Sequence, residues 1–199
     1  MADLTIVRPG PLARIAEGLT RRLKTAFPPA RFSHALMPAR VDARVWASLT
    51  RNPPFVGIGF NRFGGAQTGP NILELRTEWS IYLATGNERG QDAQLLGDTL
   101  APGLFDMLTV AAAVLSNLRI PGQGTVRIAE GNHAFIEDAG DARLAVGAIE
   151  ITIDADMSVG SVLIGRDATP ADLTTQQIQW SFDGGDTVAV TDAIITEAA

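Results

Sequence analysis

The sequence predicts an α+β fold, in which a mainly antiparallel sheet packs against two to three helices and a C-terminal hairpin extension follows. Two stretches show apolar residues at helical spacing, residues 11–27 and residues 92–118, and the stretch between them alternates strictly between apolar and polar side chains. With 199 residues, 46% hydrophobic and 19% charged, the chain can form one core with an appendage.

The first predicted helix begins at Pro11, a residue suited to a first helical turn, and ends before Pro28. Its apolar residues recur at spacings of three and four and are Leu12, Ile15, Leu19 and Leu23. The opposite face is basic, with Arg14, Arg21, Arg22 and Lys24. This pattern is typical of a solvated face, and contact with a phosphate or a partner is the alternative.

The next segment, Arg31–Leu49, leaves two alternatives open. Residues 40–45 suit a strand, whereas Val41, Val45, Trp46 and Leu49 could line one side of a short helix. After two prolines, Phe55–Phe60 reads as a strand. Its Gly-x-Gly start resembles a dinucleotide-binding loop only superficially, because another strand follows instead of a helix; we expect a bent strand with a hairpin.

Residues 73–83 give the clearest strand. One face is predicted to hold Leu73, Leu75, Thr77, Trp79, Ile81 and Leu83, and the other Glu74, Arg76, Glu78, Ser80 and Tyr82. This period of two is typical of a half-buried strand.

The second helical region spans residues 92–118, and Pro102 is expected to kink or split it. Strands are predicted over residues 125–129 and 142–153, so a first domain covers residues 1–154. Residues 155–199 form an acidic extension, with a hairpin signal at residues 183–186 and a return strand over 187–195.

Charge is divided unevenly along the chain. Residues 1–76 hold eleven Lys/Arg and four Asp/Glu, a net charge of +7, whereas residues 77–199 hold five and eighteen, a net charge of −13. A charge asymmetry between two parts of a chain indicates how the chain meets partners and assembles, and says nothing about its fold. The overall pI near 4.9 argues against a general nucleic-acid binder.

Several classes of function lack support in the sequence. There is no cysteine, which excludes disulfides and thiolate metal sites. The longest aliphatic run, Val110–Leu115, is far shorter than the roughly 20 residues of a membrane-spanning helix. The first ten residues have no apolar stretch of a signal peptide, so we expect synthesis without export.

Catalytic and metal-binding motifs are also lacking. His34 and His133 have no metal-ligand spacing, and the acid clusters at residues 137–141 and 154–156 read as turn or loop composition. We therefore expect no catalytic, cofactor or metal site. The alternative class is a small-molecule-binding domain or enzyme that uses Glu137, Asp138 or His133.

The order of parts resembles one known family. A Gly-rich loop leads into the strand Leu75-Arg76-Thr77-Glu78-Trp79-Ser80-Ile81-Tyr82-Leu83-Ala84, and a polar turn at residues 86–90 precedes a long helix. A Pro-Gly turn, a strand and the alternating strand 145–154 follow. With the helix before it, this layout is similar to the tail-terminator (tail-completion) proteins of long-tailed bacteriophages, particularly Mu-like phages and prophages.

The resemblance implies a virion structural protein without enzymatic activity. Family members are small α/β proteins that form a ring, usually a hexamer, which caps the tail tube beneath the head. Implied partners are further copies of the chain, the tail tube protein, the sheath where the tail has one, and the head-neck connector, with DNA only passing through. The implied location is the head-proximal end of the tail, and the host cytoplasm during assembly.

Two features qualify this resemblance. Residues 155–199 run past the end expected for such a domain. Another head–tail connector or a baseplate component is the alternative within the same class, because similar small folds recur along phage tails.

Eight residues are candidates for an interface. Phe60, Arg62 and Phe63 lie in the Gly-flanked hairpin, and Trp180 and Phe182 lie in the extension, where they could cover a sheet edge. The remaining three are on the polar face of the long strand: Arg76, Glu78 and Tyr82. Burial in a core is the alternative for the aromatic residues. A basic part and an acidic part also favour head-to-tail pairing in a ring, unless folding mixes the two on one surface.

Overall fold

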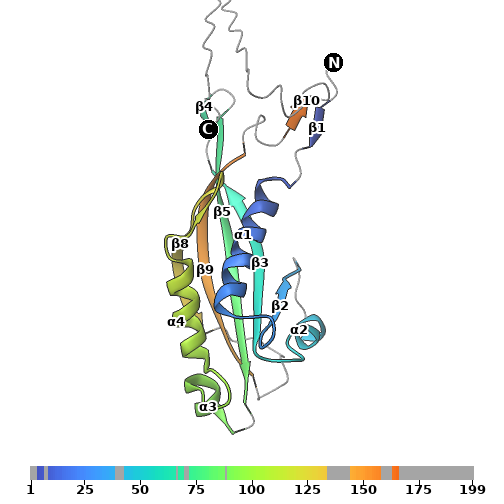
Figure 1. The fold of residues 1–199 in the computed structure, drawn as a ribbon. Coiled ribbons are helices and arrows are strands. Elements are labelled where there is room, and N and C mark those ends of the chain that lie inside the picture. Colours follow the sequence, from blue (N-terminus) through green and yellow to red (C-terminus); the bar gives the residue numbers. More distant parts are fainter. Residues whose placement is uncertain are drawn as a thin grey trace, which may run out of the picture. The chain divides into compact units, whose positions relative to one another are not determined.

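A computed structural model describes residues 4–6, 9–38, 43–65, 67–69, 72–87, 89–133, 144–157 and 163–165, and it confirms the α+β fold (Figure 1). The chain divides into two units, one within residues 8–162 and one that includes residues 4–6 and 163–165. In the smaller unit, strands β1 (Leu4–Ile6) and β10 (Leu163–Gly165) pair antiparallel.

The larger unit is built on one sheet with the strand order β2-β3-β5-β9-β8. All neighbours pair antiparallel except β2 and β3, which are parallel. The short strand β4 (Gln67–Gly69) pairs with β5, and β6 (Arg119–Ile120) and β7 (Gly124–Thr125) form a small hairpin of their own. The five strands of the main order are β2 (Ser33–Leu36), β3 (Phe55–Gly64), β5 (Ile72–Gly86), β9 (Leu144–Asp156) and β8 (Arg127–His133).

Strand β5 lies at the centre and confirms the predicted alternation. Thr77, Trp79, Ile81 and Leu83 are buried on one face. On the other face Glu74 and Arg76 are exposed, Glu78 and Tyr82 are half-buried, and Ser80 is buried. The buried polar atoms are satisfied: the Thr77 hydroxyl donates to the Ile153 carbonyl at 2.9 Å, and the Trp79 indole N–H donates to Thr77 Oγ1 at 3.0 Å.

Two helices cover the buried face of the sheet. Helix α1 (Pro11–Ala26) buries Ile15, Leu19 and Leu23, the stripe that its sequence predicts. Helix α4 (Leu104–Leu115) lies beside α1, and the Arg22 guanidinium of α1 donates to the Val114 carbonyl of α4 at 2.9 Å. A shorter helix, α3 (Gln91–Leu96), precedes α4, so the helical region is split near Pro102 as expected.

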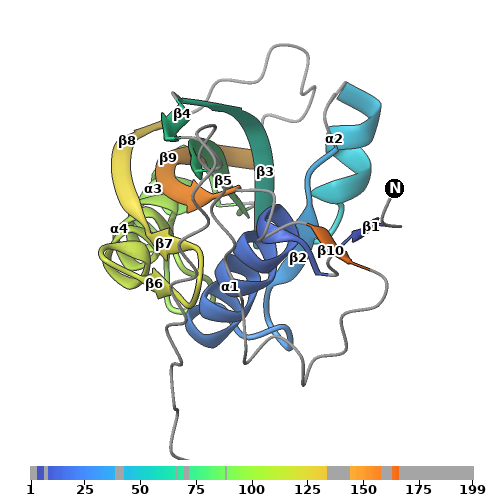
Figure 2. The same cartoon turned by 90° about the horizontal axis from the view of Figure 1, so that it is seen from above.

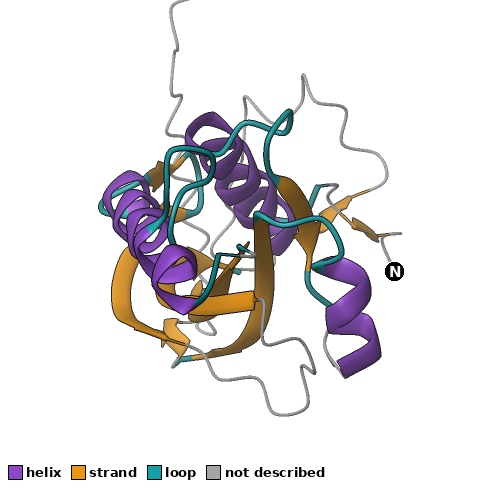
Figure 3. Cartoon of the chain, turned by 90° about the horizontal axis from the view of Figure 1, so that it is seen from below, coloured by secondary structure: helices purple, strands orange, loops and turns teal. Residues whose placement is uncertain are grey.

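A second, smaller apolar cluster lies on the opposite face of the sheet, beneath helix α2 (Ala43–Leu49). Figure 3 shows the curved sheet with helices on both sides. Residues 43–49 form the helix of the two open alternatives, whereas Val41 lies outside the described residues. Trp46 of this helix is buried against Phe55, with ring centroids 6.1 Å apart. Strand β2 was not predicted. It lies so close to β3 that a Cβ at Gly57 would sit 2.7 Å from the Met37 sulfur.

Element ends differ from the predictions by a few residues. Strand β9 continues to Asp156, two residues past the predicted end of the first domain, and β8 runs to His133 instead of ending at Ala129. The hairpin signal at residues 183–186 and the return strand over 187–195 lie outside the described residues, so the extension as a hairpin stays a prediction.

One pair of isoleucines tests the packing of the sheet. Ile128 and Ile151 are direct neighbours on β8 and β9, but Ile151 is 1% exposed and Ile128 is 37% exposed. We expect Ile151→Ala to lower the free energy of unfolding by about 3 kcal/mol, because it leaves a cavity in the core. The matched control, Ile128→Ala, should cost less than about 1 kcal/mol. Urea denaturation of both variants measures this, and equal losses would contradict the described burial.

Candidate functional site

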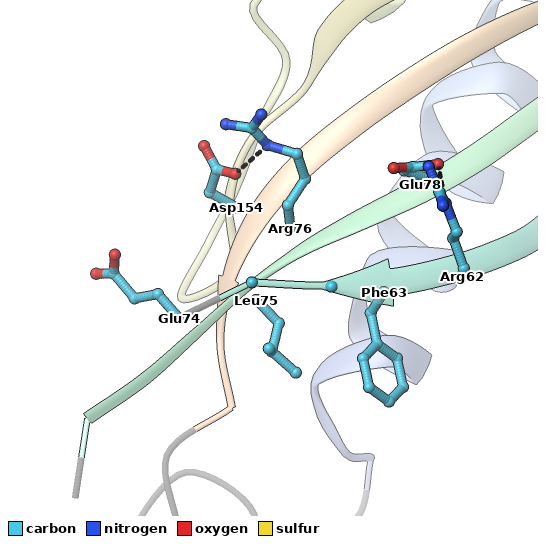
Figure 4. A pocket seen from close by; sticks show the side chains of 9 residues that line it. Arg62, Phe63, Glu74, Leu75, Arg76, Glu78 and Asp154 are labelled. Atoms are coloured by element: carbon cyan, nitrogen blue, oxygen red, sulfur yellow. Dashed lines mark hydrogen bonds and ion pairs between the residues drawn. The ribbon is translucent and has the colours of Figure 1, made fainter. Parts of the chain in front are cut away.

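Five of the eight candidate interface residues lie together at one end of the β3–β5 ladder. In this ladder Arg62 is paired with Glu78, and Gly64 with Arg76. The close view in Figure 4 shows Arg62, Phe63, Arg76 and Glu78 around one hollow. Phe60 belongs to the same end of β3, because its ring contacts the ring of Phe63.

A β-bulge at Asn61 determines which side these residues face. The pairing register with β5 shifts between Phe60 and Arg62, so Asn61 is an extra residue in β3. Residues three apart in a regular strand point to opposite faces, but here Phe60 and Phe63 share one face, with ring centroids 6.2 Å apart. The ring of Trp79 completes this group at 5.1 Å from Phe60. Phe60 and Phe63 are 38% and 54% exposed.

The other face carries a row of ion pairs that crosses four strands. Arg62 Nε lies 2.7 Å from Glu78 Oε2, and Arg76 Nε lies 2.9 Å from Asp154 Oδ1. Arg127 Nη1 of β8 approaches the second oxygen of Asp154 at 3.3 Å. The hydrogen bond from Arg62 lowers the pKa of Glu78 and raises the pKa of Arg62, and Asp154 raises the pKa of Arg76. Since these side chains are exposed to water, the pairs mainly select partners and register and add little stability.

A polar network centred on the buried Ser80 lies beside these ion pairs. The Asn61 amide donates to the Ser80 hydroxyl at 2.7 Å and to a Glu150 carboxylate oxygen at 2.9 Å. The Ser80 hydroxyl donates to the other Glu150 oxygen at 2.7 Å. The network links β3, β5 and β9 on the face away from α1 and fixes the bulge in place. Sequence reasoning missed it, because no pattern shows that Asn61 is the extra residue.

The hollow between the ion pairs has a volume of about 570 Å³. Its floor is backbone at Gly65, where a Cβ would lie 2.7 Å from the Glu74 carbonyl oxygen, so glycine is required there. The described side chains that line it are guanidinium, carboxylate and apolar groups, without a hydroxyl, thiol or imidazole. Such a surface can form charge-assisted hydrogen bonds and apolar contacts with another protein.

The remaining candidate interface residues do not join this group. Tyr82 lies farther along β5, half-buried beneath α2, with its ring 6.2 Å from the ring of Trp46. Trp180 and Phe182 lie outside the described residues, so their roles stay predictions.

The residues of the alternative chemical hypothesis are placed only in part. His133 is exposed at the end of β8, and Glu137 and Asp138 lie outside the described residues. A ring nitrogen of His34 lies 2.7 Å from the Phe27 carbonyl oxygen, which ties the end of α1 to β2. Among the residues that the structure describes, no group of three or more His, Asp or Glu could hold a metal ion. Within the same residues, no helix is long and apolar enough to cross a membrane.

The two charge regions of the sequence belong to different elements of the fold. Described residues 9–65, which form α1, β2, α2 and β3, hold eight Lys/Arg and one acid, a net charge of +7. Described residues 72–157 hold four Arg and nine acids, a net charge of −5. Helix α1, which lies beside α4, carries four of the eight cations, and β9 carries three of the nine acids, whereas the edge strands β2 and β8 have no net charge (Figure 2).

A second exposed apolar surface was missed by sequence reasoning. We call it the α3–α4 corner: Leu96, Leu100 and Phe105, which are 66%, 80% and 48% exposed. Its signal in the sequence is that α4 has more apolar positions than one buried stripe needs, since Leu104, Met107, Ala111 and Leu115 already form that stripe.

Asp98 fixes the shape of this corner. Its carboxylate accepts hydrogen bonds from the backbone N–H groups of Leu100 at 2.7 Å and Ala101 at 3.0 Å, and from the side-chain amide of Asn87 at 3.0 Å. Arg89 adds an ion pair at 3.3 Å. These hydrogen bonds lower the pKa of Asp98 to about 2, and the one from Asn87 has the largest effect.

Comparison of the chain with models of known protein families finds no match, and comparison with curated protein sequences finds none either.

The lowered pKa of Asp98 predicts a pH-dependent contribution to stability. A carboxyl whose pKa falls on folding stabilises the folded state above its unfolded pKa, and this contribution is lost as the pH falls toward the folded value of about 2. We therefore expect Asp98→Asn to lower the midpoint of thermal unfolding at pH 7, and this difference from the unsubstituted chain to shrink progressively below pH 4. Calorimetry from pH 7 to pH 2 measures it. A difference that is independent of pH would refute the assigned role of the carboxylate.

Proposed function

We propose that the chain is a virion structural protein of the tail-terminator type. In this proposal it assembles as a homohexameric ring, caps the tail tube at its head-proximal end, and offers its other face to the head-neck complex. It acts by contact alone, without catalysis or a cofactor. Together with the layout of the sequence, the observation that carries the proposal is the separation of cations and acids onto different elements of the fold.

This separation supports a ring because of the geometry that a ring requires. Closed rings use heterologous contacts, in which one face of a subunit meets a different face of the next. Helices α1 and α2 together carry five Lys/Arg and one acid, whereas α3, α4 and β9 together carry five acids and no Lys/Arg. Opposite charge therefore favours contact between these unlike elements, and like charge disfavours twofold contact of either set with itself.

The exposed end of the β3–β5 ladder supplies a surface for the tube. Phe60 and Phe63 form an apolar group there, and Arg62 and Glu78 add polar groups on the opposite side of the same strands. Exposed aromatic residues beside charged groups are typical of protein interfaces. We assign this end of the sheet to contact with the terminal tube subunits.

Two other functions remain to be separated from this one by experiment. A head–tail connector or baseplate component would associate with phage particles at a different position. A small-molecule-binding domain would bind its ligand as a single chain and would not associate with tail tubes.

Association with tail tubes tests the proposal directly. Purified chain is mixed with tail tubes assembled from the tube protein of the same phage or prophage and is then imaged by electron microscopy. We expect density at one end of each tube and an arrest of further tube growth. Binding along the whole tube, or tube growth at the unchanged rate, would contradict capping.

A pair of phenylalanine variants separates tube contact from other surfaces. We expect Phe63→Asp to abolish capping and to leave the fold and the solution mass unchanged, because the ring is 54% exposed. The control is Val110→Asp, at a residue of α4 that is 40% exposed and lies outside the α3–α4 corner. If Phe63→Asp keeps its circular dichroism spectrum and still caps tubes as well as the unsubstituted chain, this end of the sheet is ruled out as the tube contact.

A further inference from the structure

We infer that the α3–α4 corner of one copy inserts into a groove between α1 and β2 of the next copy. This inference rests on the proposed ring and identifies the contact that builds it. The occupant of the groove is thus a second copy of this chain.

The groove lies between helix α1 and the outer side of β2 and has a volume of about 650 Å³. Its floor is apolar, with Ala16, Ala35, Leu36 and Ile58, and Leu36 is 62% exposed although it lies in a strand. Strand β2 is the last strand on this side of the described sheet, so its outer edge is open.

The rim of the groove is mainly basic. Arg21 and Lys24 of α1 line it, with His34 of β2, and Glu17 is the one acidic residue among its lining side chains. A surface that combines an apolar floor with cations fits a partner that combines apolar side chains with carboxylates.

The α3–α4 corner has this composition. Its three apolar side chains stand among Asp92, in the first turn of α3, and Asp106, in the first turn of α4, and both aspartates are exposed. The hydrogen bonds of Asp98 hold the loop between the helices in one shape, so little conformational entropy is lost when the corner binds.

The charges also select the geometry of the contact. If two copies met groove to groove, Arg21 and Lys24 of one copy would face the same residues of the other. If they met corner to corner, the aspartates of the two copies would face each other. Corner with groove pairs opposite charges and covers both apolar surfaces. In Figure 2, α3 and α4 lie apart from β2, so the corner and the groove of one copy are different parts of its surface.

Disulfide cross-linking tests this contact, because the chain has no cysteine of its own. The full-length double variant Leu36→Cys/Leu100→Cys is oxidised and run on non-reducing gels. We expect a ladder of covalent oligomers that extends to the size of the ring, and only monomers from either single variant. Dimers from a single variant would reveal a twofold contact and overturn the inference.

Charge reversal provides a second test that does not depend on cysteine geometry. Lys24→Glu and Asp106→Lys should each weaken self-association by about tenfold, and the double variant should recover most of that loss. Glu130→Lys, at an exposed residue of β8 outside the groove, the corner and the hollow, is the control and should have no effect. Additive losses without recovery would overturn the pairing of these two surfaces.

The two proposals fail in different ways. Oligomers that persist without cross-links and are insensitive to charge reversal would overturn the corner-in-groove contact and leave the ring intact. A chain that stays at 21.0 kDa, alone and with tail tubes, would overturn the proposed function itself.

Discussion

The alternation of apolar and polar side chains along β5 is the constraint on which the rest of the structure depends. Strand β5 pairs with β3 on one side and with β9 on the other. Its register therefore determines which side chains of both neighbouring strands point toward the core. One face, with Trp79 and Ile81, must be covered, and α1 and α4 cover it. A slip of one residue would turn that apolar face to water, so the pattern specifies a single register.

From this sheet follow the two kinds of surface that we assign to assembly. The bulge at Asn61 brings Phe60 and Phe63 to one face, where no described helix buries them, and leaves the Arg62–Glu78 pair on the other. The charge asymmetry of the sequence is kept in the fold, because the cations concentrate on α1 and α2 and the acids on α3, α4 and β9. Surfaces for a tube and for a neighbouring copy are thereby held on one rigid frame.

Much of this fold was predictable from sequence, wherever one local pattern determines the outcome. Period two along residues 73–83 predicted β5, and spacings of three and four predicted α1, because burial of one face dominates both. Strand β2 was missed because four residues with mixed side chains show no period. The gathering of Arg62, Phe63, Arg76 and Glu78 depends on a bulge and on pairing between distant segments, and the α3–α4 corner becomes visible only once the buried stripe of α4 is known.

The central claim is that polarised copies of this chain associate head to tail and close into a ring. Light scattering coupled to size exclusion, over a range of salt concentrations, tests this most directly. The account predicts a mass of about 126 kDa, six chains of 21.0 kDa, that falls as salt screens the opposite charges. A mass near 42 kDa that is unchanged by salt would contradict it, because a twofold dimer uses like surfaces and does not build a ring.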